Sequence, residues 1–421
     1  MECPFPVLPG SDAERRLLSM LLTELDYHDL MYVLQPVHVV VPEYEVASVV
    51  EGSNEVEAGP LPPSPFYEGR TSNYVVADMP RDPLELKGTY RSAVEAGAEL
   101  LVLRGPGFGF IPQGPGLSLQ SNDYPPIPAV VVDGEVKAGS PIEVHLRGRV
   151  REGLAYNLVV DRQGDSDETV VFLTHVDSWP RTADACPAVN VMTRLVRFVA
   201  SRNPRKSFRF VFATARHFGD PALPGMHWGV GHRHYFSRFD DAVLAIDFEA
   251  ATTLSMVASE EAHGLLGIGP GFSPFAASVH PDMMGIPTIH LEGGLDMMGA
   301  LESIVESVDS MDRVADRLAE RYAAAISPSL SRFGAGNLIN KIDGSNLASV
   351  RRLMTRYLVV NERKIVRPLS ILDFLSTARG AEVIEVGSGF RLMGRQSPGS
   401  LGRALINDLT QELRYILMRG E

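Results

Sequence analysis

The second half of the chain alternates between apolar strand-like runs and helical segments, and this alternation limits the fold most strongly. The strand-like runs are Val170–Thr174, Phe208–Phe212, Ala242–Asp247 and Ile286–His290. The helical segments are Val189–Ala200, a short one near Arg233–Phe236, and Met311–Ala325. Strands that alternate with helices predict an α/β fold, with a mostly parallel mixed sheet flanked by helices. In such a sheet, functional residues lie at the carboxyl ends of the strands.

The first 150 residues follow a different pattern. Ser11–Glu14 has the spacing of a capping box, and it opens a helix through Leu25. Strand-like runs follow at Val37–Pro42 and Glu43–Val50, and Gly52–Pro65 has the composition of a linker. Beyond it the strand-like runs are Asn73–Asp78, Glu99–Arg104, Ile127–Val132 and Ile142–Val150, with one helix at Lys87–Ala96. This part of the chain therefore predicts a compact, mainly-β unit.

These patterns divide the chain into three parts. We expect a discontinuous α/β domain made of residues 1–54 and 151–326, with residues 55–150 inserted into it. Residues 327–421 form a C-terminal α+β extension in this interpretation. Its expected elements are a helix near Ser345–Tyr357, strands near Lys364–Leu369 and Glu382–Met393, and a closing helix Leu401–Met418. Pairing of the second strand across subunits would make the extension a dimerisation arm.

Composition excludes several classes of function. The chain of 421 residues has a formal net charge of −13 at pH 7, which argues against binding to nucleic acid. It has no apolar run long enough to span a bilayer, and its first residues lack the pattern of a signal peptide. Cys3 and Cys186 are the two cysteines, so we expect no disulfide framework. We therefore expect a cytoplasmic protein without contact with a membrane or nucleic acid.

Several side chains that bind metals follow the predicted strands. His175 and Asp177 come directly after the first strand, Asp184 follows them, and Asp247 ends a later strand. Imidazole and carboxylate ligands suit zinc or a similar divalent ion. Asp177 is also placed to orient the imidazole of His175 from behind. The alternative is that these acids cap helices, as Asp184 would cap a helix that begins near Pro187.

An ordered series of segments resembles the zinc-dependent exopeptidase family that contains aminopeptidases and glutaminyl cyclases. The segments are Val171–Ser178 (H-x-D-S), Ala183–Ala185 (the bridging Asp), Phe210–Gly219 (A-E-E-x-G), Gly231–Phe236 (G-S-R-x-Y), Leu244–Asp247 (N-L-D), Gly285–Ile289 (G-I-P) and Ser310–Val314 (D-T-x-D-x-I). Residues 55–150 resemble a protease-associated domain, through Ala93–Ala98 and Ile127–Val130. Together these segments cover most of residues 10–326 in the family's order.

The resemblance implies a site with two metal ions, of which this chain keeps one half. One ion would lie on His175, Asp184 and Asp247. In the second half His217 stands where the family has a glutamate, and imidazole supplies no negative charge. The family's late histidine falls near Val305, which cannot bind a metal. His290 is the substitute near it, and other candidates are His227, His232 and His234. The resemblance therefore implies zinc, with one ion favoured over two.

The residue at the family's general-base position is Arg216. A guanidinium stays protonated in proteins, so Arg216 cannot accept a proton from water. A fixed cation also opposes the binding of a metal ion beside it. Arg216 could instead bind a carboxylate or phosphate group, or pair with Glu249 or Asp220.

The resemblance and the altered residues together support three functional hypotheses, and the implied substrate is a peptide or a small molecule. The first is an aminopeptidase-like metallohydrolase with a degraded two-metal site, in which Glu249 or Glu292 replaces the lost base. The second is a catalytically inactive homologue that binds a peptide or an anion, or that acts in assembly. The third is an acyl-transfer enzyme like the glutaminyl cyclases, which use one zinc ion.

Overall fold

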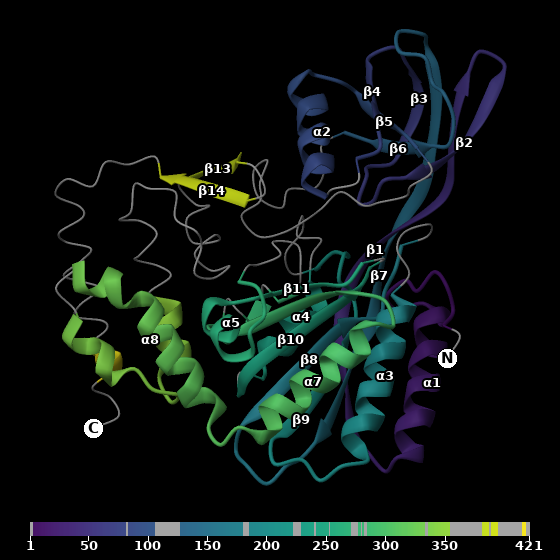
Figure 1. The fold of residues 1–421 in the computed structure, drawn as a ribbon. Coiled ribbons are helices and arrows are strands. Elements are labelled where there is room, and N and C mark those ends of the chain that lie inside the picture. The colour runs from purple at the N-terminus through teal and green to yellow at the C-terminus, as the bar shows by residue number, and fades with distance from the viewer. Residues whose placement is uncertain are drawn as a thin grey trace.

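The computed structural model describes residues 3–80, 83–105, 127–179, 185–221, 229–239, 241–251, 253–270, 277–278, 280–281, 284–332, 336–353, 381–386, 389–394 and 415–417. Its centre is a mixed sheet with helices on both faces (Figure 1). Four neighbouring strands of this sheet are parallel: β12 (Thr288–Gly293), β10 (Ala242–Ala250), β8 (Thr169–His175) and β9 (Ser207–Ala213). The α/β class predicted from the alternating pattern is confirmed.

Antiparallel strands flank the parallel four. β11 (Ser255–Ala258) pairs with β12, and β7 (Ile142–Arg162) pairs with β9 on the opposite side. β1 (Met31–Glu51) then pairs with β7 along almost its full length. Two strands were predicted here, at Val37–Pro42 and Glu43–Val50. The structure has one continuous strand instead, with a register shift between Tyr44 and Val46.

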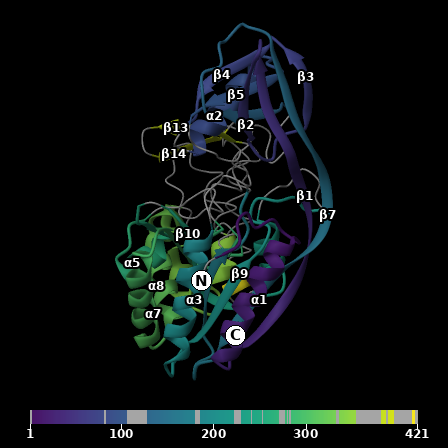
Figure 2. The same cartoon turned by 90° about the vertical axis from the view of Figure 1, so that its right-hand side faces the viewer.

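Successive side chains of a strand point to opposite faces of the sheet, so the apolar residues of the parallel strands contribute to a core on each face. Val170 and Phe172 point into a core shared with α1 (Asp12–Tyr27), α3 (Cys186–Ala200) and α7 (Met297–Ser310). Val171 and Leu173 point to the opposite face, which α4 (Val230–Phe236) covers. Because both faces are buried there, the middle of β8, Val170–Leu173, is an unbroken apolar run, as is common in parallel strands. Figure 2 shows α1, α3 and α7 on the same side of the sheet.

A second unit extends from the ends of β1 and β7, in the upper part of Figure 1. It contains β2 (Asn54–Pro60), β3 (Tyr67–Thr71), β4 (Tyr74–Asp78), α2 (Pro83–Glu95), β5 (Leu100–Arg104) and β6 (Ala129–Val132). It has its own apolar clusters, one of them between α2 and the strands β5 and β6. The linker predicted at Gly52–Pro65 is wrong in part, because β2 pairs with β1.

The helical region that follows β12 also differs from the prediction. One helix was expected at Met311–Ala325, whereas the structure has α7 and then α8 (Val314–Arg332). α5 (Glu260–Leu266) packs against α8, and residues 336–341 form a short 3₁₀ helix. Of the C-terminal extension, residues 347–353 are helical, and β13 (Ala381–Val386) pairs with β14 (Gly389–Gly394) as a hairpin. The strand predicted at Lys364–Leu369 lies outside the described residues, as does most of the helix predicted at Leu401–Met418.

The N-terminal capping box forms with one change of partner. Ser11 Oγ accepts a hydrogen bond from the Glu14 N–H, at 3.2 Å. The Glu14 carboxylate accepts from the N–H of Gly10, one residue before the cap, at 2.8 Å. Its other oxygen accepts from the Thr214 hydroxyl, so this buried glutamate joins the start of α1 to the loop after β9.

The two cysteines form a disulfide bond, Cys3–Cys186, so the expectation of none is wrong. The bond joins the N-terminal segment to the first residue of α3. A pair this far apart in sequence cannot be recognised from spacing, because the fold alone brings it together. Disulfides persist in oxidising compartments and in the intracellular proteins of hyperthermophiles, so the bond lends no support to the cytoplasmic expectation. In the part of the chain that the structure describes, no helix is both long and apolar enough to cross a membrane.

Candidate functional site

The candidate site lies at the carboxyl ends of the four parallel strands. His175 ends β8, Arg216 and His217 follow β9, Asp247 and Glu249 lie near the end of β10, and His290 and Glu292 lie on β12. The register places Asp247 beside His290 and Glu249 beside Glu292. Residues that are more than 100 positions apart in sequence therefore meet at one edge of the sheet, as predicted from the fold class.

His175 has a backbone partner at one of its two ring nitrogens. Its Nδ1 lies 2.9 Å from the backbone carbonyl oxygen of Asp177, whereas the Asp177 carboxylate is 3.9 Å away. A carbonyl only accepts, so Nδ1 carries a proton, and in the neutral ring the lone pair lies on Nε2. Nε2 is therefore the nitrogen with which His175 could bind a metal.

The Asp177 carboxylate has a different task from the one predicted. It is fully buried, and its two oxygens accept hydrogen bonds from the backbone N–H of Arg216, at 2.9 and 3.0 Å. Burial raises the pKa of this carboxyl, against the lowering by His175 and by the hydrogen bonds. Just before Arg216, Ala215 has a φ of 53°, a left-handed conformation that costs free energy for a residue with a Cβ. Asp177 thus fixes the turn that presents Arg216.

Arg216 is buried and forms an ion pair with Glu249. Its Nε and Nη2 donate to the same oxygen, Glu249 Oε1, at 2.9 and 2.5 Å. Burial alone would raise the pKa of Glu249, but Arg216 outweighs it and holds the pKa well below the usual range. Of the two partners named from sequence, Glu249 is therefore the one that pairs. Asp220 lies 3.1 Å from Arg233 instead.

Asp247 and Glu292 enclose His290. Nδ1 of His290 lies 2.9 Å from Asp247 Oδ2, and Nε2 lies 3.1 Å from Glu292 Oε1. Burial would lower the pKa of His290, but the two carboxylates raise it to about 10. With a proton on each nitrogen, His290 has no lone pair for a metal in this arrangement. Asp247 Oδ2 also accepts from the Ser278 N–H, at 3.0 Å, whereas the buried Oδ1 has no hydrogen-bond partner among the described residues.

Three further histidines are buried close to Arg216. Burial, with Arg216 next, holds the pKa of His217 and of His232 well below the usual value. For His280 burial acts first and His232 second. The rings of His232 and His280 stack at 5.8 Å, and His217 meets His175 edge to face at 5.8 Å. His280 was missed in the sequence, because a single histidine in a loop gives no pattern.

These residues fit one metal ion in part and oppose a second. Asp184 lies outside the described residues, and among those described no group of three or more His, Cys, Asp or Glu is placed to hold a metal ion. Nε2 of His175 and Oδ1 of Asp247 have the chemistry of two of the three predicted ligands. At the position that the resemblance gives to the general base, the Arg216 guanidinium pairs with Glu249, and Val305, near the family's late histidine, is buried in the apolar core on α7.

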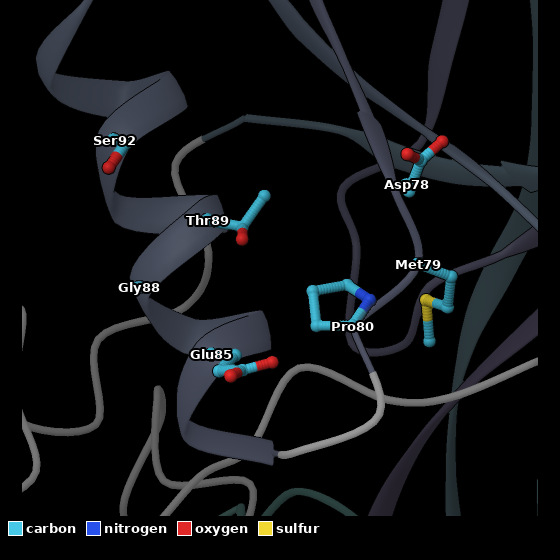
Figure 3. Close-up of a pocket in the computed structure, with 7 residues that line it drawn as sticks. All are labelled: Asp78, Met79, Pro80, Glu85, Gly88, Thr89 and Ser92. Carbon is cyan, nitrogen blue, oxygen red and sulfur yellow. The ribbon is translucent and has the colours of Figure 1, made fainter. Parts of the chain in front are cut away.

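A separate cavity of about 850 Å³ lies in the second unit, between the end of β4 and α2 (Figure 3). Its lining residues are Asp78, Met79, Pro80, Glu85, Gly88, Thr89 and Ser92. Asp78 pairs with Arg104 at 2.8 Å. None of the predicted site residues lines this cavity, so it is distinct from the site at the strand ends.

Comparisons with known proteins connect this fold to zinc exopeptidases. No protein-family profile and no curated protein sequence matches the chain. Among solved structures, the zinc aminopeptidase BSAP from Bacillus subtilis aligns with a TM-score of 0.50 at 12% identity, over 73% of this chain and 94% of that one. A peptidase M28 precursor from Shewanella amazonensis aligns with a TM-score of 0.49 at 17% identity, over 68% and 80%. An aminopeptidase from Aneurinibacillus sp. strain AM-1 gives 0.48 at 15%, over 72% and 89%. At these identities the likeness concerns the fold.

Proposed function

We propose that this chain is an aminopeptidase-like protein that binds a peptide terminus or a small anion and does not hydrolyse peptides by the two-metal route. It keeps the metallohydrolase fold and a half-site for one zinc ion. The observation that carries the proposal is the Arg216–Glu249 ion pair. Arg216 occupies the position of the family's general base, and Glu249 is one of the two carboxylates that could have replaced that base.

The protonation states argue against water activation. A general base must be unprotonated and must have a pKa near the working pH to be efficient. Arg216 is always protonated, and Arg216 keeps the pKa of Glu249 far below neutral, which makes Glu249 a weak base. Glu292, the other substitute, already accepts from the protonated His290. Arg216, Glu249 and Glu292 are thus each unsuited to the task or already engaged.

The charges also argue against a second metal ion. The Arg216 guanidinium stands at the family's general-base position, and the His290 imidazolium lies beside Asp247. Both cations are compensated by carboxylates of the protein, so the site has little negative charge left for a second dication. The other half differs. His175 Nε2 and Asp247 Oδ1, with Asp184, would hold one zinc ion, which would supply a Lewis acid that attracts a carboxylate or a carbonyl oxygen.

Elemental analysis and a turnover assay test this proposal together. The purified protein would be stripped with chelator, dialysed, and given zinc, cobalt or manganese with aminoacyl reporter substrates. We expect about one zinc per chain and no turnover, while short peptides and carboxylate anions bind in titration calorimetry. Turnover with any metal, or two metals per chain, would contradict the proposal. So would the failure of every peptide and anion to bind.

A restored variant makes the negative result interpretable. Arg216→Glu with His217→Glu returns the two acids of the family's A-E-E segment. Arg216→Lys keeps the positive charge and serves as the matched control. If the cation is what blocks the reaction, only the double variant gains turnover. A further variant, Glu292→Gln, tests the alternative of a one-zinc hydrolase with Glu292 as base. Such an enzyme would be active without restoration and would lose that activity in Glu292→Gln.

The remaining parts of the proposal concern the surroundings of the site. We propose that residues 55–150 are a protease-associated-like insertion, supported by their own apolar clusters. We further propose that residues 1–54 and 151–326 form the fold that carries the site, and that residues 327–421 form an extension through which two copies associate. Sedimentation of the full chain beside a version truncated at residue 353 would test the last point.

A further inference from the structure

The N-terminal segment is attached to the site at two points, one covalent and one through hydrogen bonds. Cys3 forms the disulfide with Cys186 at the start of α3. Val7 pairs with Ser178: the Ser178 N–H donates to the Val7 carbonyl at 2.8 Å, and the Val7 N–H donates to Ser178 Oγ at 3.1 Å. Both Val7 and Ser178 are buried. We call these two attachments together the clasp.

The clasp is continuous with the residues that position Arg216. Ser178 stands between Asp177, whose carboxylate accepts the Arg216 N–H, and Trp179. Trp179 is buried and stacks on Phe218 at a ring distance of 4.2 Å. The loop after β9 is therefore held on both sides of His217 by the two neighbours of Ser178. A displacement of Ser178 would reach this loop through one hydrogen-bonded contact and one packed ring.

The chain beyond the clasp is fixed independently. Arg151 Nη2 donates to the Pro9 carbonyl at 2.9 Å, and the Gly10 N–H donates to the Glu14 carboxylate at 2.8 Å. These contacts do not involve the disulfide, so its opening would release residues 3–8 and not the chain from Pro9 onward. Cys3 and Cys186 are both partly exposed, so a small dithiol can reach the bond.

We propose that Cys3–Cys186 is a redox-operated clasp on the candidate site, which a dithiol reductant opens. One thiolate of the reductant attacks a cysteine sulfur and breaks the Cys3–Cys186 bond, giving a mixed disulfide. The second thiolate of the reductant then displaces the cysteine and closes a cyclic disulfide. Two electrons and two protons pass to the protein, which ends with two thiols. In the open form the loop of Arg216 and His217 loses its restraint through Ser178. The proposal concerns regulation of the site to which the proposed function belongs.

Hydrogen exchange of the full chain, read by mass spectrometry, tests the clasp without any ligand. The protein as purified in air should show no free thiols and, after dithiothreitol, two. Reduction should speed amide exchange about tenfold or more at residues 176–178 and 213–219, while β5 and β6 of the second unit stay unchanged. Cys3→Ser with Cys186→Ser should give the fast exchange in air and no response to dithiothreitol. Ser178→Ala, which keeps the disulfide and removes the bond to Oγ, should give a smaller increase at the same residues.

Three results would overturn the clasp. They are two free thiols in the protein purified in air, an unchanged exchange at residues 213–219 after reduction, and an equal increase across the whole chain, which is what a purely structural disulfide would give. Peptide titration of the oxidised and reduced forms then separates the two proposals. A response in exchange with no binding to either form leaves the clasp standing and defeats the binding function. Binding without any response in exchange does the opposite.

Discussion

The two halves of the candidate site differ in how their charges are compensated. In the half built from Arg216 and Glu249, each charged group has a partner of opposite sign within the protein. In the half built from His175 and Asp247, Nδ1 of His175 is bonded to a carbonyl oxygen, and the buried Asp247 Oδ1 lacks a hydrogen-bond partner among the described residues. A buried polar atom without a partner costs free energy, so it is normally satisfied by water, an ion or a ligand. The charges of the first half are thus compensated within the protein, whereas the second half has atoms that could bind a ligand.

Among the predictions that test this difference, removal of Arg216 has the largest expected effect, which is a loss of unfolding free energy. Arg216→Ala leaves the Glu249 carboxylate in its partly buried place without a cation. Loss of one partner from a buried ion pair costs about 3–5 kcal/mol of unfolding free energy. Chemical denaturation of the wild type and the variant measures it.

A double-mutant cycle supplies the control. Arg216→Met with Glu249→Leu removes both charges and should recover most of the loss, since apolar replacements of a buried pair are often neutral. An equally unstable double variant would mean that Arg216 stabilises the fold by packing rather than by charge.

The pH dependence of stability contrasts Glu249 with Glu14, a buried carboxylate that accepts hydrogen bonds from Thr214 and Gly10. Burial raises the pKa of Glu14 to about 7, against the lowering by Thr214 and Gly10. A carboxyl with a raised pKa in the folded state contributes its stability below the unfolded value of 4.5, and this is lost as the pH rises toward 7. The loss amounts to about 3 kcal/mol if the whole shift is expressed.

Denaturant titrations between pH 4 and 8 check this contribution. Glu14→Gln should remove most of the fall in stability over that range, whereas Glu45→Gln, at an exposed position on β1, should leave it unchanged. A wild-type stability that rises from pH 4.5 to 7, or an unchanged fall in Glu14→Gln, would contradict the assignment. For Glu249 the sign is reversed, since its lowered pKa gives stability that is lost only in strong acid.

The smallest expected effect concerns the zinc affinity of the half built from His175 and Asp247. Asp247→Asn keeps the shape of the side chain and the acceptor for Ser278 but removes the charge that a metal needs. We expect zinc to bind at least about tenfold more weakly, which corresponds to about 1.4 kcal/mol. Competition with a fluorescent chelator measures the affinity.

Glu292→Gln is the matched control for this measurement, because Glu292 contacts His290 from the partly exposed side. Its zinc affinity should stay within a factor of about two of the wild type. Equal losses in both variants would show that the site responds to total negative charge and not to Asp247 as a ligand.

The sequence predicted the parallel strands and their terminal residues because both signals are local. An apolar run of five or six residues marks a strand buried on both faces, and the polar residue after it marks the strand end. Arg216 was recognised as unsuited to a base from its side-chain chemistry, and Glu249 was one of its two named partners. The predictions that were wrong concern segments whose structure depends on a distant partner. One example is β2, which forms because β1 extends far enough to pair with it.

The sequence by itself determined that a cation stands at the end of β9 and that histidine and carboxylates end the neighbouring strands, since these follow from residue identity and strand periodicity. Only the tertiary structure decided which charges compensate one another. It paired Arg216 with Glu249, placed His290 between two carboxylates, and turned the Asp177 carboxylate toward a backbone amide. It also joined Cys3 to Cys186. Such pairings depend on distances of a few ångströms between segments far apart in the chain, and the chain fixes those distances only when it folds.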